Sequence, residues 1–210
     1  MHTTWLNFLA QVAIILPAFL VSVSFHEFSH ALMALILGDN TAKRNGRLTL
    51  NPLAHVDLMG LFFLLVFRIG WANPVPMDYR NFKYPRLYAI ITALAGPFSN
   101  FLLAVICFFC IAHFPAAHFS PAIATTFVQI LDATAQINVM LGVFNILPIP
   151  PLDGSHIIIS LLINRFPRIV LWLYRYSILI LIALFIIPQF RSMLIQLISY
   201  TEHMLKSLVF

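Results

Sequence analysis

Two histidines and a glutamate lie close together inside the first long apolar stretch of the chain, in the order His26-Glu27-Phe28-Ser29-His30. Residues four apart share one face of an α-helix, so both imidazoles can reach the same metal ion. Glu27, beside the first imidazole, can act as general base toward a water molecule on that metal. Ionisable side chains at membrane depth are costly and usually mark function. The pentad therefore predicts a zinc hydrolase whose active site lies within the bilayer.

The composition indicates a membrane protein. Of 210 residues, 61% are hydrophobic and 9% are charged, whereas an average soluble domain has about 25% charged residues. We expect an all-α polytopic membrane protein with about four to five transmembrane helices, a re-entrant segment and a possible short β-hairpin near the active site. The net charge of +5 is small and dispersed, which fits membrane topology and indicates no nucleic-acid partner. We expect the chain to be embedded in, and in contact with, the lipid bilayer.

Full membrane spans need about 20 apolar residues, and four are predicted, over residues 8–37, 87–112, 123–147 and 169–187. Residues 58–72 are apolar but fewer, so a re-entrant segment is expected there. A short apolar helix is predicted over residues 156–163, and a short strand or hairpin is possible over residues 47–50. Residues 188–210 receive no assignment. We expect one membrane domain over residues 1–210, with a catalytic core over about 8–163 and C-terminal helices over about 168–210.

The distribution of basic residues predicts the orientation, because Lys and Arg in short loops are enriched on the cytoplasmic side. If residues 58–72 re-enter, one face receives eight basic residues: Lys43, Arg44, Arg47, Arg80, Lys83, Arg86, Arg165 and Arg168. The N-terminal tail and the loop 113–118 contain neither Lys nor Arg. We therefore predict an external N-terminus and an active site a short way in from the cytoplasmic face.

A third metal ligand must come from elsewhere in the chain, because catalytic zinc usually takes three protein ligands and leaves a position for water. Asp39 is too near the histidines in sequence to reach back, and Asp78 and Glu202 are expected in surface segments. The remaining candidates are His55, Asp57, Asp132, Asp153 and His156.

Asp153 is the best of these candidates on physical grounds. It follows a proline-rich break, where unwound backbone can aim a side chain inward, and it precedes Gly154, which permits close packing. The predicted topology also places it on the face of the histidines. Asp132 is expected to be a hydrogen-bonded interior residue with Gln136 four positions later, and His156 is expected to be interfacial. The other candidates stay open.

The stretch around Asp153 carries a family resemblance. Residues 144–154, FNILPIPPLDG, closely resemble the N-x-x-P-x-P-x-L-D-G signature of site-2 proteases, the intramembrane zinc metalloproteases. Three further stretches resemble motifs of that family in the same order: NPLAHVD at 51–57, GWANPVP at 70–76 and AGPFSN at 95–100. The resemblance covers well over half the chain. Because PDZ and CBS domains would not fit, we expect the compact branch of the family.

The resemblance implies roles for several of the motif residues. His26, His30 and Asp153 would bind one Zn²⁺ per chain, Glu27 would activate the water, and Asn145 would hold the substrate backbone or the reacting carbonyl. The implied reaction is endopeptidase cleavage of a transmembrane segment in a membrane-tethered protein. The implied location is the inner membrane of a bacterial-type cell, with the site toward the cytoplasm. His55 and Asp57, from the first of the three stretches, would support the site or pin its loop.

Two other functions fit the same residues. In a metal-binding channel or transporter, an ion path would be lined by His26, Glu27, His30, Asp132 and Asp153, and transport would survive Glu27→Gln. A non-catalytic protein would bind transmembrane helices tightly and yield no products. The sequence leaves the substrate and the oligomeric state open.

Overall fold

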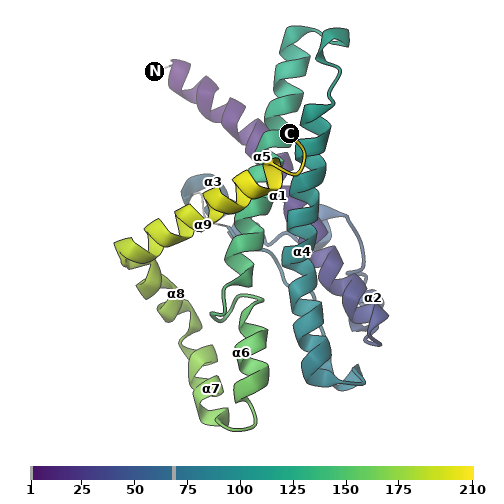
Figure 1. The fold of residues 1–210 in the computed structure, drawn as a ribbon, viewed down its shortest axis with the longest axis vertical. Helices are drawn as coiled ribbons and strands as arrows, with labels where there is room; N and C mark the ends of the chain where they lie inside the picture. Colours follow the sequence, from purple (N-terminus) through teal and green to yellow (C-terminus); the bar gives the residue numbers. More distant parts are fainter. Residues whose placement is uncertain (1, 68–69) are drawn as a thin grey trace.

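The computed structural model describes residues 2–67 and 70–210, and the regular structure within these ranges is helical (Figure 1). Three long helices form the frame: α1 (His2–Ile36), α4 (Pro85–Ala112) and α5 (Pro121–Ile146). Each is long and apolar enough to cross a bilayer, α1 over Leu9–Ile36. A bent pair of shorter helices gives a fourth candidate span. The predicted all-α multi-pass fold is confirmed, with three or four spans where about four to five were predicted.

Prolines mark where two of the long helices, α4 and α5, begin. Pro85 starts α4 and Pro121 starts α5, which costs no hydrogen bond because the first turn of a helix has no internal acceptor for its N–H groups. Ser120 caps α5, since its hydroxyl accepts the N–H of Ile123 at 3.5 Å. A 3₁₀ turn, η3 (Ala116–His118), lies in the connection between the two helices.

The buried core lies between α4 and α5. Ala104 and Phe108 of α4 meet Ala135 and Val139 of α5, and none of the four side chains is more than 1% exposed. Small residues allow two helix backbones to approach closely, which is the usual packing of membrane helices. α1 packs against both, so three helices hold one another at the level of the His26 pentad.

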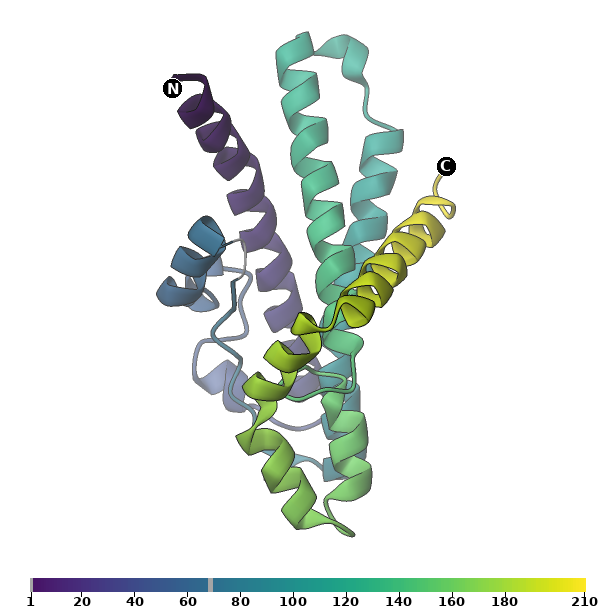
Figure 2. The same cartoon turned by 90° about the vertical axis from the view of Figure 1, so that its left-hand side faces the viewer.

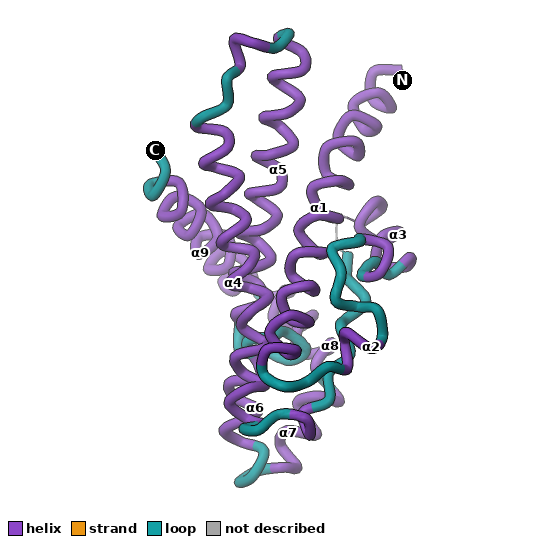
Figure 3. The backbone as a smooth tube through the Cα atoms, turned by 90° about the vertical axis from the view of Figure 1, so that its right-hand side faces the viewer, coloured by secondary structure: helices purple, strands orange, loops and turns teal. Residues whose placement is uncertain are grey.

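The described residues 37–67 and 70–84 form a loop-rich insertion between α1 and α4 (Figure 3). It contains α2 (Thr41–Arg44), η1 (Pro52–Ala54), α3 (Leu58–Phe67) and η2 (Tyr79–Asn81). With 10 residues, α3 is about 15 Å long, half of the roughly 30 Å hydrocarbon core. This length fits the predicted re-entrant segment.

The possible hairpin near residues 47–50 is not formed. In the part of the chain that the structure describes, the β-pairing is one isolated antiparallel bridge between Val56 and Ala72. The carbonyl of Thr49 accepts a hydrogen bond from Nε2 of His55 at 2.8 Å, and the hydroxyl of Thr49 accepts one from the N–H of Asn51 at 3.1 Å. These polar turn contacts take the place of strand pairing, because side-chain bonds to the local backbone compete with a ladder.

The C-terminal part contains four helices: α6 (Ser155–Leu162), α7 (Pro167–Arg175), α8 (Ser177–Ile186) and α9 (Pro188–Lys206). The predicted fourth span is broken, since α7 and α8 meet at 65°. α9, which the sequence left unassigned, crosses α4 and α5 (Figure 1) and buries Leu194 and Leu205 in the core. Near its end Glu202 pairs with Lys206 at 2.7 Å.

The two ends of the helix frame differ in charge (Figure 2). The N-terminus and the α4–α5 connection lie at one end, and residues 1–8 and 113–120 contain neither Lys nor Arg. α2, the start of α4 and the α6–α7 turn lie toward the other end and carry Lys43, Arg44, Arg86, Arg165 and Arg168. These five of the eight basic residues are therefore separated from the end that holds the N-terminus, as the predicted sorting requires.

Candidate metal centre

The two histidines of the pentad point at one place because α1 continues through them without a break. His26 and His30 are 8% and 4% exposed. Their rings meet edge to face, with centroids 4.6 Å apart, and the two Nε2 atoms are 3.0 Å apart. The helical spacing thus converges both imidazoles on one point inside the protein.

Asp153 reaches this point from the loop that follows α5. Its Oδ2 lies 3.1 Å from Nε2 of His26 and 3.3 Å from Nε2 of His30. The loop is fixed by Gly154, whose N–H donates to the carbonyl of Asn145 at 2.7 Å. A Cβ at position 154 would come within 2.0 Å of the carbonyl oxygen of Ile146, so only glycine permits this approach.

The donor set fits a zinc ion. Zinc bound tetrahedrally to nitrogen and oxygen at about 2.0–2.1 Å separates neighbouring ligand atoms by about 3.3 Å. The observed triangle of ligand atoms has sides of 3.0, 3.1 and 3.3 Å. Oδ2 of Asp153 is also buried without a hydrogen-bond partner, which a metal ion would supply. Two imidazoles and one carboxylate form a ligand set found in catalytic zinc sites.

A buried amide network orients His26. Its Nδ1–H donates to Oδ1 of Asn100 in α4 at 2.6 Å, and Asn100 Nδ2 donates to Oδ1 of Asn138 in α5 at 2.6 Å. Asn138 in turn donates to the hydroxyl of Ser22 in α1 at 2.7 Å. Asn100, Asn138 and Ser22 are fully buried. With Nδ1 protonated and held, Nε2 of His26 presents its lone pair to the metal position.

His30 is oriented through α4 as well. Its Nδ1–H donates to the carbonyl of Thr92 at 2.8 Å, so its Nε2 also faces the metal position. One turn later, Gly96 makes room for both rings. A Cβ there would come within 2.4 Å of His30 Nε2 and 2.7 Å of His26 Cε1. Both this glycine and Asn100 belong to the AGPFSN stretch at 95–100, but the sequence did not predict their contacts with the histidines.

Glu27 contacts the insertion rather than another helix. Its Oε2 accepts the N–H of Val75 at 3.0 Å in a buried bond. Val75 lies between Pro74 and Pro76, and because proline has no N–H, Val75 is the one donor that this triplet offers. Oε1 of Glu27 makes no hydrogen bond within the described ranges. This contact was not predicted from the sequence, although the Pro-Val-Pro triplet, with its single backbone donor, was a signal for it.

The other candidate ligands lie elsewhere. Asp132 accepts a hydrogen bond from Gln136 at 2.7 Å, as expected for a paired residue of α5. His55 is fully buried and bound to the Thr49 carbonyl, and Asp57 accepts the N–H of Gly60 at 2.8 Å. Within the described residues, the group of acids, cysteines and histidines close enough to share a metal ion is His26, His30 and Asp153.

Asn145 and His156 border the centre without joining it. The side-chain amide of Asn145 donates to the carbonyl of Leu141 in its own helix at 3.1 Å. The ring of His156 packs on Tyr79, with centroids 6.0 Å apart. Burial, together with the charges of Tyr174 and Asp153, raises the pKa of Tyr79 to about 12, so this hydroxyl keeps its proton at neutral pH.

Asp39 holds the insertion against the end of α1. This fully buried carboxylate accepts hydrogen bonds from the N–H and hydroxyl of Thr41, the N–H of Asp78 at 2.8 Å and the amide of Asn81 at 2.7 Å. Burial alone would raise the pKa of Asp39, but these bonds outweigh it and lower the pKa below 3.8. Asp39 is therefore a structural anchor for the segment that leads to α4.

Comparison with known proteins places the chain among metallopeptidases. A family model described as Peptidase family M50 matches residues 113–184. The chain is 40% identical over 171 residues to "Putative zinc metalloprotease YwhC" of Bacillus subtilis, covering 80% of this chain and 78% of that protein. It is 30% identical over 205 residues to "Putative zinc metalloprotease Rip2" of Mycolicibacterium smegmatis, covering 93% and 75%. No solved structure matches the chain significantly.

Proposed function

The chain belongs to peptidase family M50, the site-2 protease family, and on this premise we propose that it cleaves a peptide bond within a transmembrane segment of a membrane-tethered protein. It is a zinc metalloendopeptidase with several membrane spans. The observation that carries the proposal is the convergence of His26, His30 and Asp153 on one point, with Glu27 beside His26.

One zinc ion per chain would be held by Nε2 of His26, Nε2 of His30 and Oδ2 of Asp153. When bound, zinc supplies Lewis acidity that polarises the scissile carbonyl and makes water more acidic. The protein's contribution is to keep the two imidazoles in the tautomer that leaves Nε2 unprotonated. Asn100 and the carbonyl of Thr92 support this tautomer through the two Nδ1–H bonds.

Glu27 is the general base of the proposed reaction. Its Oε2 is fixed by Val75, so Oε1 would accept the proton of the attacking water and pass it to the nitrogen of the leaving amine. The side chain is 7% exposed, which limits competition from bulk water. Asn145 would hold the substrate backbone or the reacting carbonyl through its amide, exchanging its bond to Leu141 for the substrate.

The substrate must unwind locally, because a helix hides its carbonyls in its own hydrogen bonds. The backbone N–H groups of Leu48 and Leu50 make no hydrogen bond within the described part of the chain. An extended substrate segment could pair with them by β-augmentation. Leu48 and Leu50 belong to the same insertion whose Val75 N–H donates to Glu27.

The active site would face the cytoplasm, in a bacterial-type inner membrane. The end of the molecule with α2 and the α6–α7 turn carries the clustered basic residues, and basic loops are enriched on the cytoplasmic side. The metal centre is formed by the C-terminal half of α1 and the loop after α5, both nearer this end. The N-terminus would then lie outside.

The direct test is cleavage of single-pass membrane proteins by purified enzyme in liposomes, with the cut located by mass spectrometry. We expect cuts inside the transmembrane segment for the wild type and none for Glu27→Gln. The matched control is Glu202→Gln, which changes a carboxylate in α9 that is paired with Lys206 and should leave cleavage unchanged. Cleavage retained by Glu27→Gln would refute the mechanism, and cuts confined to loops would refute the proposed substrate class.

A further inference from the structure

An acidic residue at the centre of a membrane span has no part in the metal centre. Asp132 lies eleven residues after the first residue of α5 and fourteen before the last (Pro121–Ile146). Its side chain is half-buried, and its partner is the amide of Gln136 at 2.7 Å. Within the described residues, no basic side chain forms an ion pair with it. A carboxylate at this depth is costly and is a functional candidate by default.

Asp132 belongs to a row of polar side chains along α5. Gln129, Asp132 and Gln136 are separated by three and four residues, so they share one face of the helix. Gln129 and Gln136 are exposed. We call these three residues the polar stripe of α5.

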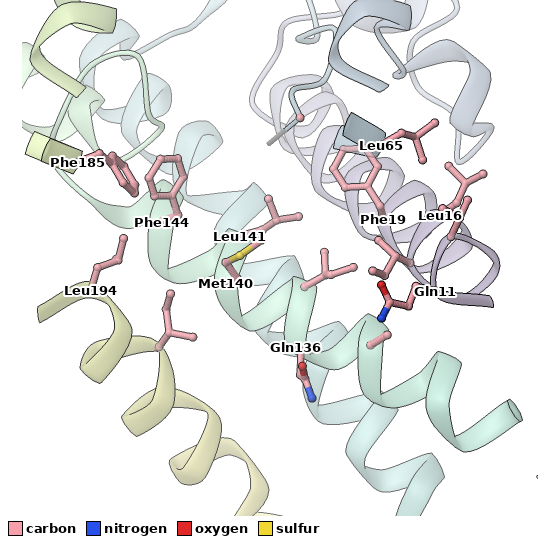
Figure 4. A pocket seen from close by; sticks show the side chains of 16 residues that line it. Gln11, Leu16, Phe19, Leu65, Gln136, Met140, Leu141, Phe144, Phe185 and Leu194 are labelled. Carbon is pink, nitrogen blue, oxygen red and sulfur yellow. The ribbon is translucent and has the colours of Figure 1, made fainter. Parts of the chain in front are cut away.

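One residue of the polar stripe, Gln136, lines an apolar cavity of about 460 Å³ between α1, α5 and the C-terminal helices. Asp132 lies behind this lining and is joined to it through the hydrogen bond from Gln136. Figure 4 shows Gln136 of the stripe and Gln11 of α1 toward one end of the cavity, and Phe144 and Phe185 toward the other. The N-terminal half of α1 diverges from α5 on this side (Figure 2). The cavity therefore combines an apolar body with amide groups at one end, and one of these amides, that of Gln136, is bound to the Asp132 carboxylate outside the lining.

We propose that this cavity and the polar stripe dock the transmembrane helix of the substrate, and that Asp132 selects helices with a basic residue near their centre. The inference rests on the proposed function and names a feature of its substrates. Charge complementarity decides the occupant: an acyl chain would fill the apolar body but leave the Asp132 carboxylate without a counter-charge. A Lys or Arg on an apolar helix satisfies both parts.

The position of Asp132 also predicts where such a substrate is cut. Asp132 precedes Asn145, at the end of α5 beside the metal centre, by 13 residues, which is about 20 Å along a helix. Consider a substrate helix that lies along α5 with its basic residue beside Asp132. The substrate residue at the metal centre would then be about 13 positions from that basic residue, toward the cytoplasmic end. Moving the basic residue by one helical turn should move the cut by the same amount.

Binding of designed helices tests the inference without relying on cleavage. The full chain carrying Glu27→Gln, which blocks the proposed turnover, is placed in nanodiscs with one of two single-pass Leu-Ala helices of about 20 residues, which differ in a central Lys or Leu. Binding is measured by energy transfer between dyes. We expect the Lys helix to bind about tenfold more tightly than the Leu helix, the order of one interhelical polar contact in a membrane.

Variants at Asp132 decide the cause of this preference. Asp132→Asn should reduce it to less than about threefold, and Asp132→Lys should prefer a helix with a central Asp. Glu202→Gln is the matched control and should keep the wild-type preference. Equal binding of the two helices, no binding of either, or a preference that survives Asp132→Asn would overturn the inference. Cleavage of both helices by the wild type with equal binding would leave the protease function standing while this inference fails.

Discussion

Replacing Asn100 by leucine should weaken zinc binding without touching a zinc ligand. The side chain is fully buried between α1, α4 and α5. It accepts the Nδ1–H of His26 at 2.6 Å and donates to Asn138 at 2.6 Å. Leucine branches at Cγ as asparagine does but has neither hydrogen-bonding group. The substitution therefore removes the partner that fixes the tautomer and orientation of the His26 ring.

The magnitude follows from the groups left unpaired. Loss of a supporting hydrogen bond to a metal ligand lowers metal affinity by about 10–100-fold, which is about 1.4–2.7 kcal/mol. The buried Nδ1–H of His26 and Oδ1 of Asn138 also lose their partner, and each such loss costs about 1–3 kcal/mol of stability. The expected result is a zinc Kd raised by one to two orders of magnitude, together with a lower melting temperature.

The assay is zinc competition with a chelator on detergent-purified protein whose helix content matches the wild type. Asn138→Leu separates the two effects, because it breaks the outer part of the network and leaves Asn100 Oδ1 for His26. It should lower stability but change the zinc Kd by less than about threefold. A wild-type Kd in folded Asn100→Leu, or an equal loss of zinc in both variants, would refute the reasoning.

Three further predictions concern the metal centre and its surroundings. Gly96→Ala places a methyl group against both imidazoles and should cost about 1–3 kcal/mol of stability with loss of zinc, measured by thermal unfolding and metal analysis. Glu27→Gln should abolish cleavage while keeping the wild-type zinc content, and zinc loss in this variant would contradict its assignment as a base. Asp39→Asn should unfold at a lower temperature than the wild type at pH 7. The pKa of the Asp39 carboxyl is lowered in the folded state, so its contribution to stability is present above pH 3.8 and is lost as the pH falls further. The difference in melting temperature between the wild type and Asp39→Asn should therefore shrink below pH 3.8. A difference that grows on acidification would contradict this expectation.

Local patterns predicted the parts of the site that depend on a single element. The convergence of His26 and His30 follows from helical spacing alone, and the three long apolar stretches could only form spans. Asp153 could be favoured because the proline-rich break before it had to end α5 and free the backbone. The helical spacing and the proline-rich break are each contained in one segment of sequence, whereas the placement of Asp153 on the face of the histidines also rested on the distribution of basic residues along the chain.

Contacts between distant segments could not be predicted in this way. Asn100 is 74 residues from His26 and Asn138 is 116 residues from Ser22, and no local pattern indicates which buried amides will meet. The bond from Val75 to Glu27 requires the insertion to fold back on α1. Residues 188–210 received no assignment because the apolar side chains of α9 are buried against α4 and α5, and no local pattern indicates where those two helices lie.

The central claim is that His26, His30 and Asp153 together hold one zinc ion, and the most direct test is zinc per polypeptide in the detergent-purified wild type and in Asp153→Ala. We expect about one zinc per chain in the wild type, as for a site with three protein ligands, and a clear loss in the variant. Zinc absent from folded wild type, or retained in full by Asp153→Ala, would contradict it.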